Sequence, residues 1–177
     1  IKTEEIINIL KIMEKEEGIC QIANDNAEGQ VIVSGNKEKV EFLQNILKEK
    51  KVKSIPLKVS APFHCSLMKP AAEIMKGKIE NTKFKNPLFE IINNVTAEPE
   101  MDSKKIKELL VKQIFSTVKW RDSIINMSKA GVKNFVEIGP GKVLTGMVKR
   151  TIKQANYFSI NSLSAVSYTH LRAHETD

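Results

Sequence analysis

The chain has 177 residues, 41% of them hydrophobic and 28% charged, with a formal net charge of +7. This composition is typical of one globular domain or two small subdomains and excludes a disordered or fibrous chain, while the apolar runs are too short to cross a bilayer. The positive charge favours acidic partners, but it attracts nucleic acids, phosphorylated small molecules and acidic proteins equally.

The first 58 residues show helical and strand patterns in the order helix, strand, strand, helix, strand. The expected elements are a helix over 3–15, strands over Ile19–Ala23 and Val31–Val33, a helix capped by Asn36 and a strand over Val52–Leu57. One further strand at the front would complete a ferredoxin-like βαββαβ unit. The polar cluster Asn24–Asn26 between the first two strands could be only a turn or could form a polar lip over a site.

After Leu57 strands alternate with helices, which is typical of a parallel sheet covered on both faces. The expected elements are a loop over Val59–Ser66, a helix from about Leu67 that buries Leu67, Ala71, Ile74 and Met75, a strand over Leu88–Ile92, a helix capped by Asp102 or Ser103, a helix over Trp120–Ala130, a strand over Phe135–Ile138 and a helix over Lys142–Lys153. Residues 165–177 lack a sustained amphipathic pattern and resemble a translated adapter sequence, so we interpret them as a non-native tail.

His64 is the main candidate for chemistry because it lies in a loop and is the only histidine outside this tail. An imidazole exchanges protons near neutral pH and can act as a general base, although a single loop histidine can also be structural or merely exposed. A Cys–His dyad of His64 with Cys65 is rejected, because neighbouring side chains in extended backbone point to opposite sides, and Cys65 is interpreted as a buried, inert thiol. With Cys20 it has no metal-ligand spacing, and both are expected to be free.

Other motifs that could support chemistry are incomplete. No Gly-x-Ser-x-Gly elbow occurs, so a histidine base would lack an activated serine in this chain. The segment Gly139–Gly146 fits neither the phosphate-binding loop nor the dinucleotide-binding pattern and is interpreted as a tight strand-to-helix turn. His170 and His174 have helical metal-ligand spacing, but two ligands are too few, so no metal or cofactor is expected.

Six segments share an order and spacing with one enzyme family. They are Gly18–Asn26, Gly29–Gly35, Val59–Ala71, Asn93–Ala97, Gln113–Trp120 and Glu137–Gly146. Together they resemble the bacterial malonyl-CoA:acyl carrier protein transacylases, from about residue 1 to 150. The resemblance implies an α/β class, with an α/β-hydrolase-like acyltransferase domain that carries a ferredoxin-like subdomain. Residues 1–58 would be that subdomain without its first strand, and residues 59–164 the C-terminal part of the large domain.

The resemblance also implies an activity and roles for residues. The family transfers malonyl from coenzyme A to the phosphopantetheine thiol of acyl carrier protein by a Ser/His ping-pong mechanism in fatty acid biosynthesis. By position His64 matches the catalytic histidine, and Gln113 matches the residue whose backbone carbonyl orients it. Asn24, Asn26 and Phe63 match positions on the substrate side. The family's Gly-His-Ser-x-Gly motif is absent, which implies a fragment without the nucleophile that is expected to be inactive alone.

The implied partners are malonyl-CoA and acyl carrier protein, for a cytoplasmic monomer that binds neither nucleic acid nor membranes. Two alternatives stay within the acyltransferases, namely a module of a polyketide synthase and a non-catalytic docking protein. A third is an RNA-recognition module. It is disfavoured because the strands Ile19–Ala23 and Val31–Val33 contain no aromatic residue on which a base could stack.

Overall fold

The computed structural model describes residues 1–15 and 17–162, which divide into two compact units, Ile1–Ser123 and a second that starts at Ile124. No helix in the described part of the chain is long and apolar enough to span a membrane. The predicted tail, residues 165–177, lies outside the described residues. The predicted subdomain boundary after residue 58 falls inside the first unit and stays a prediction.

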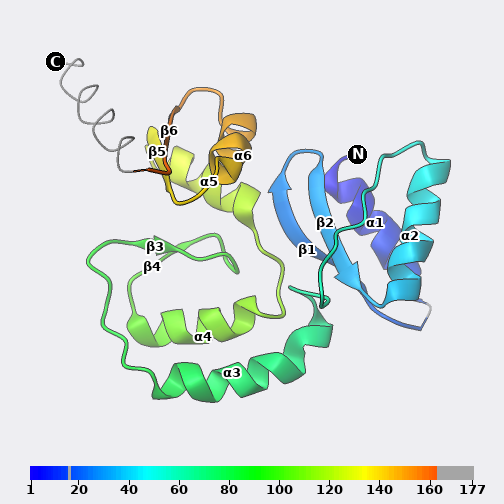
Figure 1. Ribbon diagram of the computed structural model, residues 1–177, viewed down its shortest axis with the longest axis horizontal. Coiled ribbons are helices and arrows are strands. Elements are labelled where there is room, and N and C mark those ends of the chain that lie inside the picture. Colours follow the sequence, from blue (N-terminus) through cyan, green and yellow to red (C-terminus); the bar gives the residue numbers. More distant parts are fainter. Residues whose placement is uncertain (16, 163–177) are drawn as a thin grey trace. The chain divides into compact units, whose positions relative to one another are not determined.

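The first unit begins with two helices and a hairpin that share one core (Figure 1). The elements are α1 (Thr3–Met13), β1 (Cys20–Ala27), β2 (Gln30–Gly35) and α2 (Lys37–Glu49). Strands β1 and β2 pair antiparallel, with register shifts between Ile22 and Asn24 and between Asp25 and Ala27. Apolar residues three and four positions apart place one stripe of each helix in this core, which the hydrophobic effect stabilises. The buried members are Ile6, Leu10, Met13, Leu43 and Leu47.

Two predictions for this region were wrong in detail. Asn36 does precede α2, but its side chain accepts a hydrogen bond from Ile19 N at 2.7 Å instead of capping the helix. The expected strand Val52–Leu57 is absent. Val52 N instead donates a hydrogen bond to Leu47 O at 2.8 Å at the end of α2, and Ile55 and Leu57 are exposed. A strand needs a neighbouring edge for its backbone groups, and a β-branched sequence pattern does not supply one.

The middle of the first unit is mostly helical and loop structure. Its elements are the 3-10 helix η1 (Ser66–Met68), α3 (Lys69–Asn81), β3 (Ile91–Ile92), β4 (Pro99–Glu100) and α4 (Ser103–Gln113). Helices α3 and α4 pack against each other, and β3 pairs with β4 antiparallel. The expected strand Leu88–Ile92 is limited to its last two residues. The expected burial of Ile74 and Met75 was also wrong, since α3 buries Ala72 and leaves Ile74 73% exposed.

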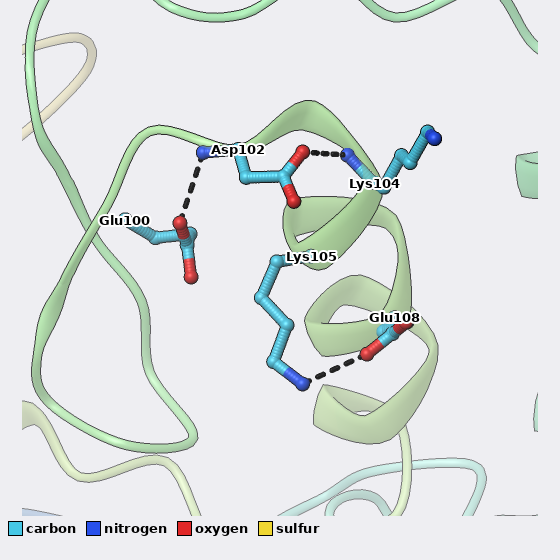
Figure 2. Close-up of polar contacts among 5 residues, drawn as sticks. All are labelled: Glu100, Asp102, Lys104, Lys105 and Glu108. Carbon is cyan, nitrogen blue, oxygen red and sulfur yellow. Dashed lines mark hydrogen bonds and ion pairs between the residues drawn. The ribbon is translucent and has the colours of Figure 1, made fainter.

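Helix α4 begins at the cap that the sequence predicts. Asp102 Oδ1 accepts from Lys104 N at 2.9 Å, and Asp102 N donates to Glu100 Oε1 at 2.9 Å (Figure 2). One turn later Lys105 Nζ contacts Glu108 Oε2 at 2.8 Å on the exposed surface. Figure 2 therefore contains three contacts: a cap that satisfies an orphan backbone amide, a hydrogen bond that holds the capping residue, and a solvated ion pair that contributes little.

Removing the cap should cost more stability than removing the ion pair. We expect Asp102→Ala to lower the free energy of unfolding by about 1 kcal/mol, because the Lys104 amide loses its acceptor. Glu108→Gln, which removes only the exposed ion pair, should leave it nearly unchanged. Urea unfolding of both variants measures the difference. An effect of Glu108→Gln as large as that of Asp102→Ala would contradict the assignment of the cap.

Helix α5 (Trp120–Lys129) leads into the second unit, which contains β5 (Asn134–Ile138), α6 (Val143–Thr151) and β6 (Asn156–Ile160). Strands β5 and β6 pair in parallel, from Asn134 opposite Asn156 to Ile138 opposite Ile160. Within the described residues each sheet has two strands, and this pair is the parallel one. Within the described residues the parallel sheet that the sequence pattern predicts is limited to one β-α-β unit, since β3 and β4 are only two residues long and pair antiparallel with each other.

The glycine-rich segment after β5 is the tight turn that the sequence predicts. Gly139 and Gly141 have φ angles of 140° and 91°, which an L side chain rarely adopts. The Glu137 carboxylate accepts from Leu144 N at 3.1 Å and from Thr145 N at 2.7 Å, at the start of α6. The chain's own carboxylate thus occupies the helix N-terminus where a phosphate would bind in a phosphate-binding loop.

This cap predicts a pH dependence. The side-chain hydrogen bond from Thr145, followed by backbone hydrogen bonds, lowers the pKa of Glu137 below its ordinary value of 4.5. Because folding lowers this pKa, the ionised carboxylate stabilises the turn fully at pH values above its ordinary pKa. This contribution is lost as the pH falls through the lowered pKa. We expect Glu137→Gln to weaken the hydrogen-exchange protection of the Leu144 and Thr145 amides at neutral pH, and this deficit to shrink at an acidic pH below the lowered pKa. An equal deficit at both pH values would contradict this role.

Candidate active site

The loop that carries His64 is strained and is closed by its own contacts. His64 has a φ of 58°, in the left-handed region that costs a non-glycine residue about 1–2 kcal/mol. The Cys65 thiol donates to Pro62 O at 3.2 Å, and Phe63 N donates to Ala61 O at 2.9 Å. The extended backbone that the sequence analysis assumed at His64 was therefore wrong, because these turn contacts reverse the chain there.

The structure places His64 and Gln113 in direct contact. His64 Nδ1 lies 2.9 Å from Gln113 O, although the two residues are 49 positions apart. A carbonyl oxygen only accepts hydrogen bonds, so the neutral ring must hold its proton on Nδ1 and keep the lone pair of Nε2. This tautomer leaves Nε2 able to take a proton from another group.

Gln113 is held at both its backbone and its side chain. It is the last residue of α4, and its Oε1 accepts from Asn94 Nδ2 at 3.0 Å. Asn94 O in turn accepts from Lys119 N at 2.8 Å. Asn94 thus connects the end of α4 to the segment that follows it. Asn94 lies in Asn93–Ala97, one of the six segments shared with the family, and no role for it follows from the sequence.

The segment after Gln113 runs along the edge of β1 that does not pair with β2. Val118 N donates to Ala23 O at 2.8 Å, and Asp25 N donates to Val118 O at 3.0 Å. The Thr117 hydroxyl donates to Ile22 O at 2.6 Å. The register shift of β1 between Ile22 and Asn24 falls where Ala23 O accepts this bond. β1 therefore binds β2 on one edge and the segment behind the histidine on the other.

An ion pair closes this junction. Arg121 donates to Asp25 Oδ2 at 2.7 Å, and the two side chains are only 22% and 12% exposed. Burial raises the pKa of the Asp25 carboxyl, and the Arg121 charge and hydrogen bond oppose that rise. The polar cluster Asn24–Asn26 is thus part of β1 and no turn. Sequence reasoning missed the pair because Asn and Asp are common turn residues.

Comparison with known proteins finds relatives of this chain in one enzyme family. No family model matches the chain. The malonyl CoA-acyl carrier protein transacylase of Haemophilus influenzae is 37% identical over 166 residues, which cover 93% of this chain and 53% of that protein. The crystal structure of an acyl carrier protein S-malonyltransferase from Vibrio cholerae matches with a TM-score of 0.90 and 35% identity, over 96% of this chain and 55% of that one. This chain is a homologue of the malonyl CoA-acyl carrier protein transacylases.

A third relative is a malonyl-transacylase solved in complex with its type II polyketide synthase acyl carrier protein. It matches with a TM-score of 0.91 and 33% identity, over 97% of this chain and 56% of that one. TM-scores near 0.9 confirm the predicted α/β acyltransferase class for this part of the fold. The chain spans about half the length of the transacylases that it matches.

The other residues that the transacylase resemblance singles out lie on β1 and on the histidine loop. Asn24 is half-buried and pairs with Val118, whereas Asn26 is buried. Phe63 precedes His64 and is 45% exposed. Their role in binding substrate stays a prediction, as do the catalytic roles of His64 and Gln113.

The two cysteines are poor candidates for a nucleophile in place of the transacylase serine. Both are free, as predicted, and Cys65 is fully buried. Burial first, and then the nearby Cys65, raise the pKa of Cys20 to about 11, so this thiol stays protonated at neutral pH. The part of the chain that the structure describes also holds no cluster of three or more side chains suited to a metal ion.

Proposed function

We propose that this chain is part of a malonyl-CoA:acyl carrier protein transacylase of fatty acid biosynthesis, with His64 as its general base and acid. The observation that supports this most is the 2.9 Å contact between His64 Nδ1 and Gln113 O. It leaves Nε2 free for proton transfer. The Gln113 carbonyl would then orient the imidazole as a carboxylate does in a Ser-His-Asp triad, without adding a charge.

In the proposed reaction His64 serves two half-reactions. The nucleophile is a serine from an elbow motif that this chain does not contain. His64 Nε2 takes the serine proton as the hydroxyl oxygen attacks the thioester of malonyl-CoA, and it then returns that proton to the departing coenzyme A thiolate. A malonyl-serine ester remains. The phosphopantetheine thiol of acyl carrier protein attacks this ester, with His64 taking the thiol proton and returning it to the serine oxygen.

The remaining parts of the proposal concern substrates and setting. Asn24, Asn26 and Phe63 would border the malonyl site, since the first two lie on β1 and the third beside the base. The net charge of +7 would speed the encounter with acidic carrier protein and with the phosphates of coenzyme A. We further propose a cytoplasmic monomer that needs no nucleic acid or membrane.

A second candidate is an acyltransferase that serves a polyketide synthase. It is favoured by one observation, the likeness to a malonyl-transacylase bound to a polyketide synthase acyl carrier protein. A third, a non-catalytic docking protein, is disfavoured because such a protein would have no need of a left-handed His64 held against a carbonyl.

The complete protein, incubated with malonyl-CoA and with either carrier protein, tests the proposal. We expect malonyl transfer, detected by the mass of the carrier, with the fatty acid carrier as the better acceptor. Preference for the polyketide carrier would favour the second candidate. The 177-residue chain alone should transfer nothing, because it lacks the serine, and measurable transfer by it would contradict the Ser/His mechanism.

A further inference from the structure

A glutamine outside the predicted site contacts the histidine loop. Gln21 lies on β1, is exposed, and its Oε1 accepts from Ser66 N at 2.8 Å. Ser66 is two residues after His64 and begins η1. The contact therefore reaches the histidine loop two residues after His64.

The same strand binds the segment that follows Gln113, the residue whose carbonyl receives the imidazole hydrogen bond. Ile22 O accepts from Thr117, and Ala23 O accepts from Val118, a few residues after Gln113. Three consecutive residues of β1, starting at Gln21, thus bind the two segments that meet in the pair His64–Gln113. The strand fixes the distance between them only if both attachments hold.

Cys65 is buried near Cys20 of β1, but the hydrogen bonding that attaches the histidine loop to β1 is slight. The turn contacts within residues 61–65 shape the loop but do not locate it relative to Gln113. Among the hydrogen bonds of the described residues, the one from Ser66 N to Gln21 Oε1 is the bond that joins this loop to β1. A residue held in the left-handed region keeps that conformation only when its surroundings over-determine it.

We propose that Gln21 is a positioning residue, which holds the His64 ring against the Gln113 carbonyl through Ser66 and so selects the Nδ1–H tautomer. Its importance for catalysis rests on the proposed function. The effect of Gln21 on the tautomer does not rest on the proposed function, because the tautomer depends on the geometry of this chain alone.

Nitrogen NMR of the labelled 177-residue chain tests this role. The ring signals of His64 are assigned by their loss in His64→Gln and recorded at alkaline pH, where imidazole is neutral. We expect the native ring to be mainly Nδ1–H. Gln21→Leu should lower the ratio of Nδ1–H to Nε2–H by about fivefold, the factor expected from losing one net hydrogen bond. Gln21→Glu, which keeps an acceptor oxygen, should restore the ratio.

Two further variants control for folding. Gln154→Leu makes the same change at an exposed residue of the second unit and should leave the ratio unaltered. Gln21→Asn stays polar but is one methylene shorter, so it should lower the tautomer ratio as Gln21→Leu does. It replaces the leucine variant if that variant does not fold. Circular dichroism confirms the fold of each variant.

The proposal is overturned if the tautomer ratio is unchanged in a folded Gln21→Leu or Gln21→Asn chain, if Gln21→Glu does not restore it, or if the native ring is mainly Nε2–H. Failure of the proposed function looks different. A tautomer that depends on Gln21 in a chain whose complete protein transfers no malonyl would support the positioning role and refute the activity.

Discussion

In the complete protein, the proposed mechanism predicts that His64→Ala slows malonylation of the serine by about 100- to 10,000-fold, the usual contribution of a positioned general base. A serine hydroxyl is a weak nucleophile until its proton is removed, and Nε2 of His64 is the nitrogen left free by the bond to Gln113 O. Binding of malonyl-CoA should change little, because the imidazole is not expected to hold the malonyl carboxylate. Single-turnover labelling followed by mass spectrometry measures the rate.

Cys65→Ala is the matched control for this loss. Cys65 is adjacent in sequence but fully buried, and its thiol donates to Pro62 O. We expect a modest loss of stability and a rate of labelling within a few-fold of the native rate. If Cys65→Ala abolishes labelling and His64→Ala does not, a thiol mechanism replaces the one proposed.

Gly35→Ala should unfold or strongly destabilise the hairpin of the first unit. A Cβ at this position would lie 2.0 Å from Ile19 O and 2.8 Å from Cys20 Cα, which are backbone atoms that no rotamer change can move aside. Gly35 pairs with Cys20 at the end of β2, so relief requires breaking the strand pairing. We expect a loss of about 3 kcal/mol or more in the free energy of unfolding, at the upper end for overpacked sites.

The control for Gly35→Ala is Gly77→Ala, for which the opposite sign is expected. Gly77 lies within α3, and a Cβ there would meet no atom within 4 Å. Alanine in an open helical position is about 1 kcal/mol more favourable than glycine. Urea unfolding should therefore show Gly35→Ala less stable and Gly77→Ala more stable than the native chain. A Gly35→Ala variant as stable as the native chain would mean that the strands pair differently.

Features that depend on local sequence were predictable. The amphipathic spacing of Ile6, Leu10 and Met13 is enough to place α1, and Asp102 is a cap because its side chain reaches an amide two residues away. Features that need a distant partner were not. Ile55 and Leu57 have the composition of a strand, but pairing depends on an edge elsewhere in the chain, and the burial of Ile74 depends on what packs against α3.

The residues of the candidate site also divide into those that were predicted from the sequence and those that were missed. His64 and Gln113 were found by resemblance to a family, since no periodicity relates two residues 49 positions apart. The residues that hold them were missed. Gln21, Asn94 and Thr117 contribute single hydrogen bonds to backbone or amide groups of other segments, and side chains of this kind have no sequence signal until the segments are brought together.

The site of malonyl attachment tests most directly whether a serine and His64 catalyse the reaction. The complete protein is incubated with malonyl-CoA, quenched in acid, digested and mapped by mass spectrometry. The expected result is a malonyl ester on the serine of a Gly-x-Ser-x-Gly elbow, with Cys20 and Cys65 unmodified. A malonyl thioester on either cysteine, with the serine unlabelled, would contradict the proposed mechanism.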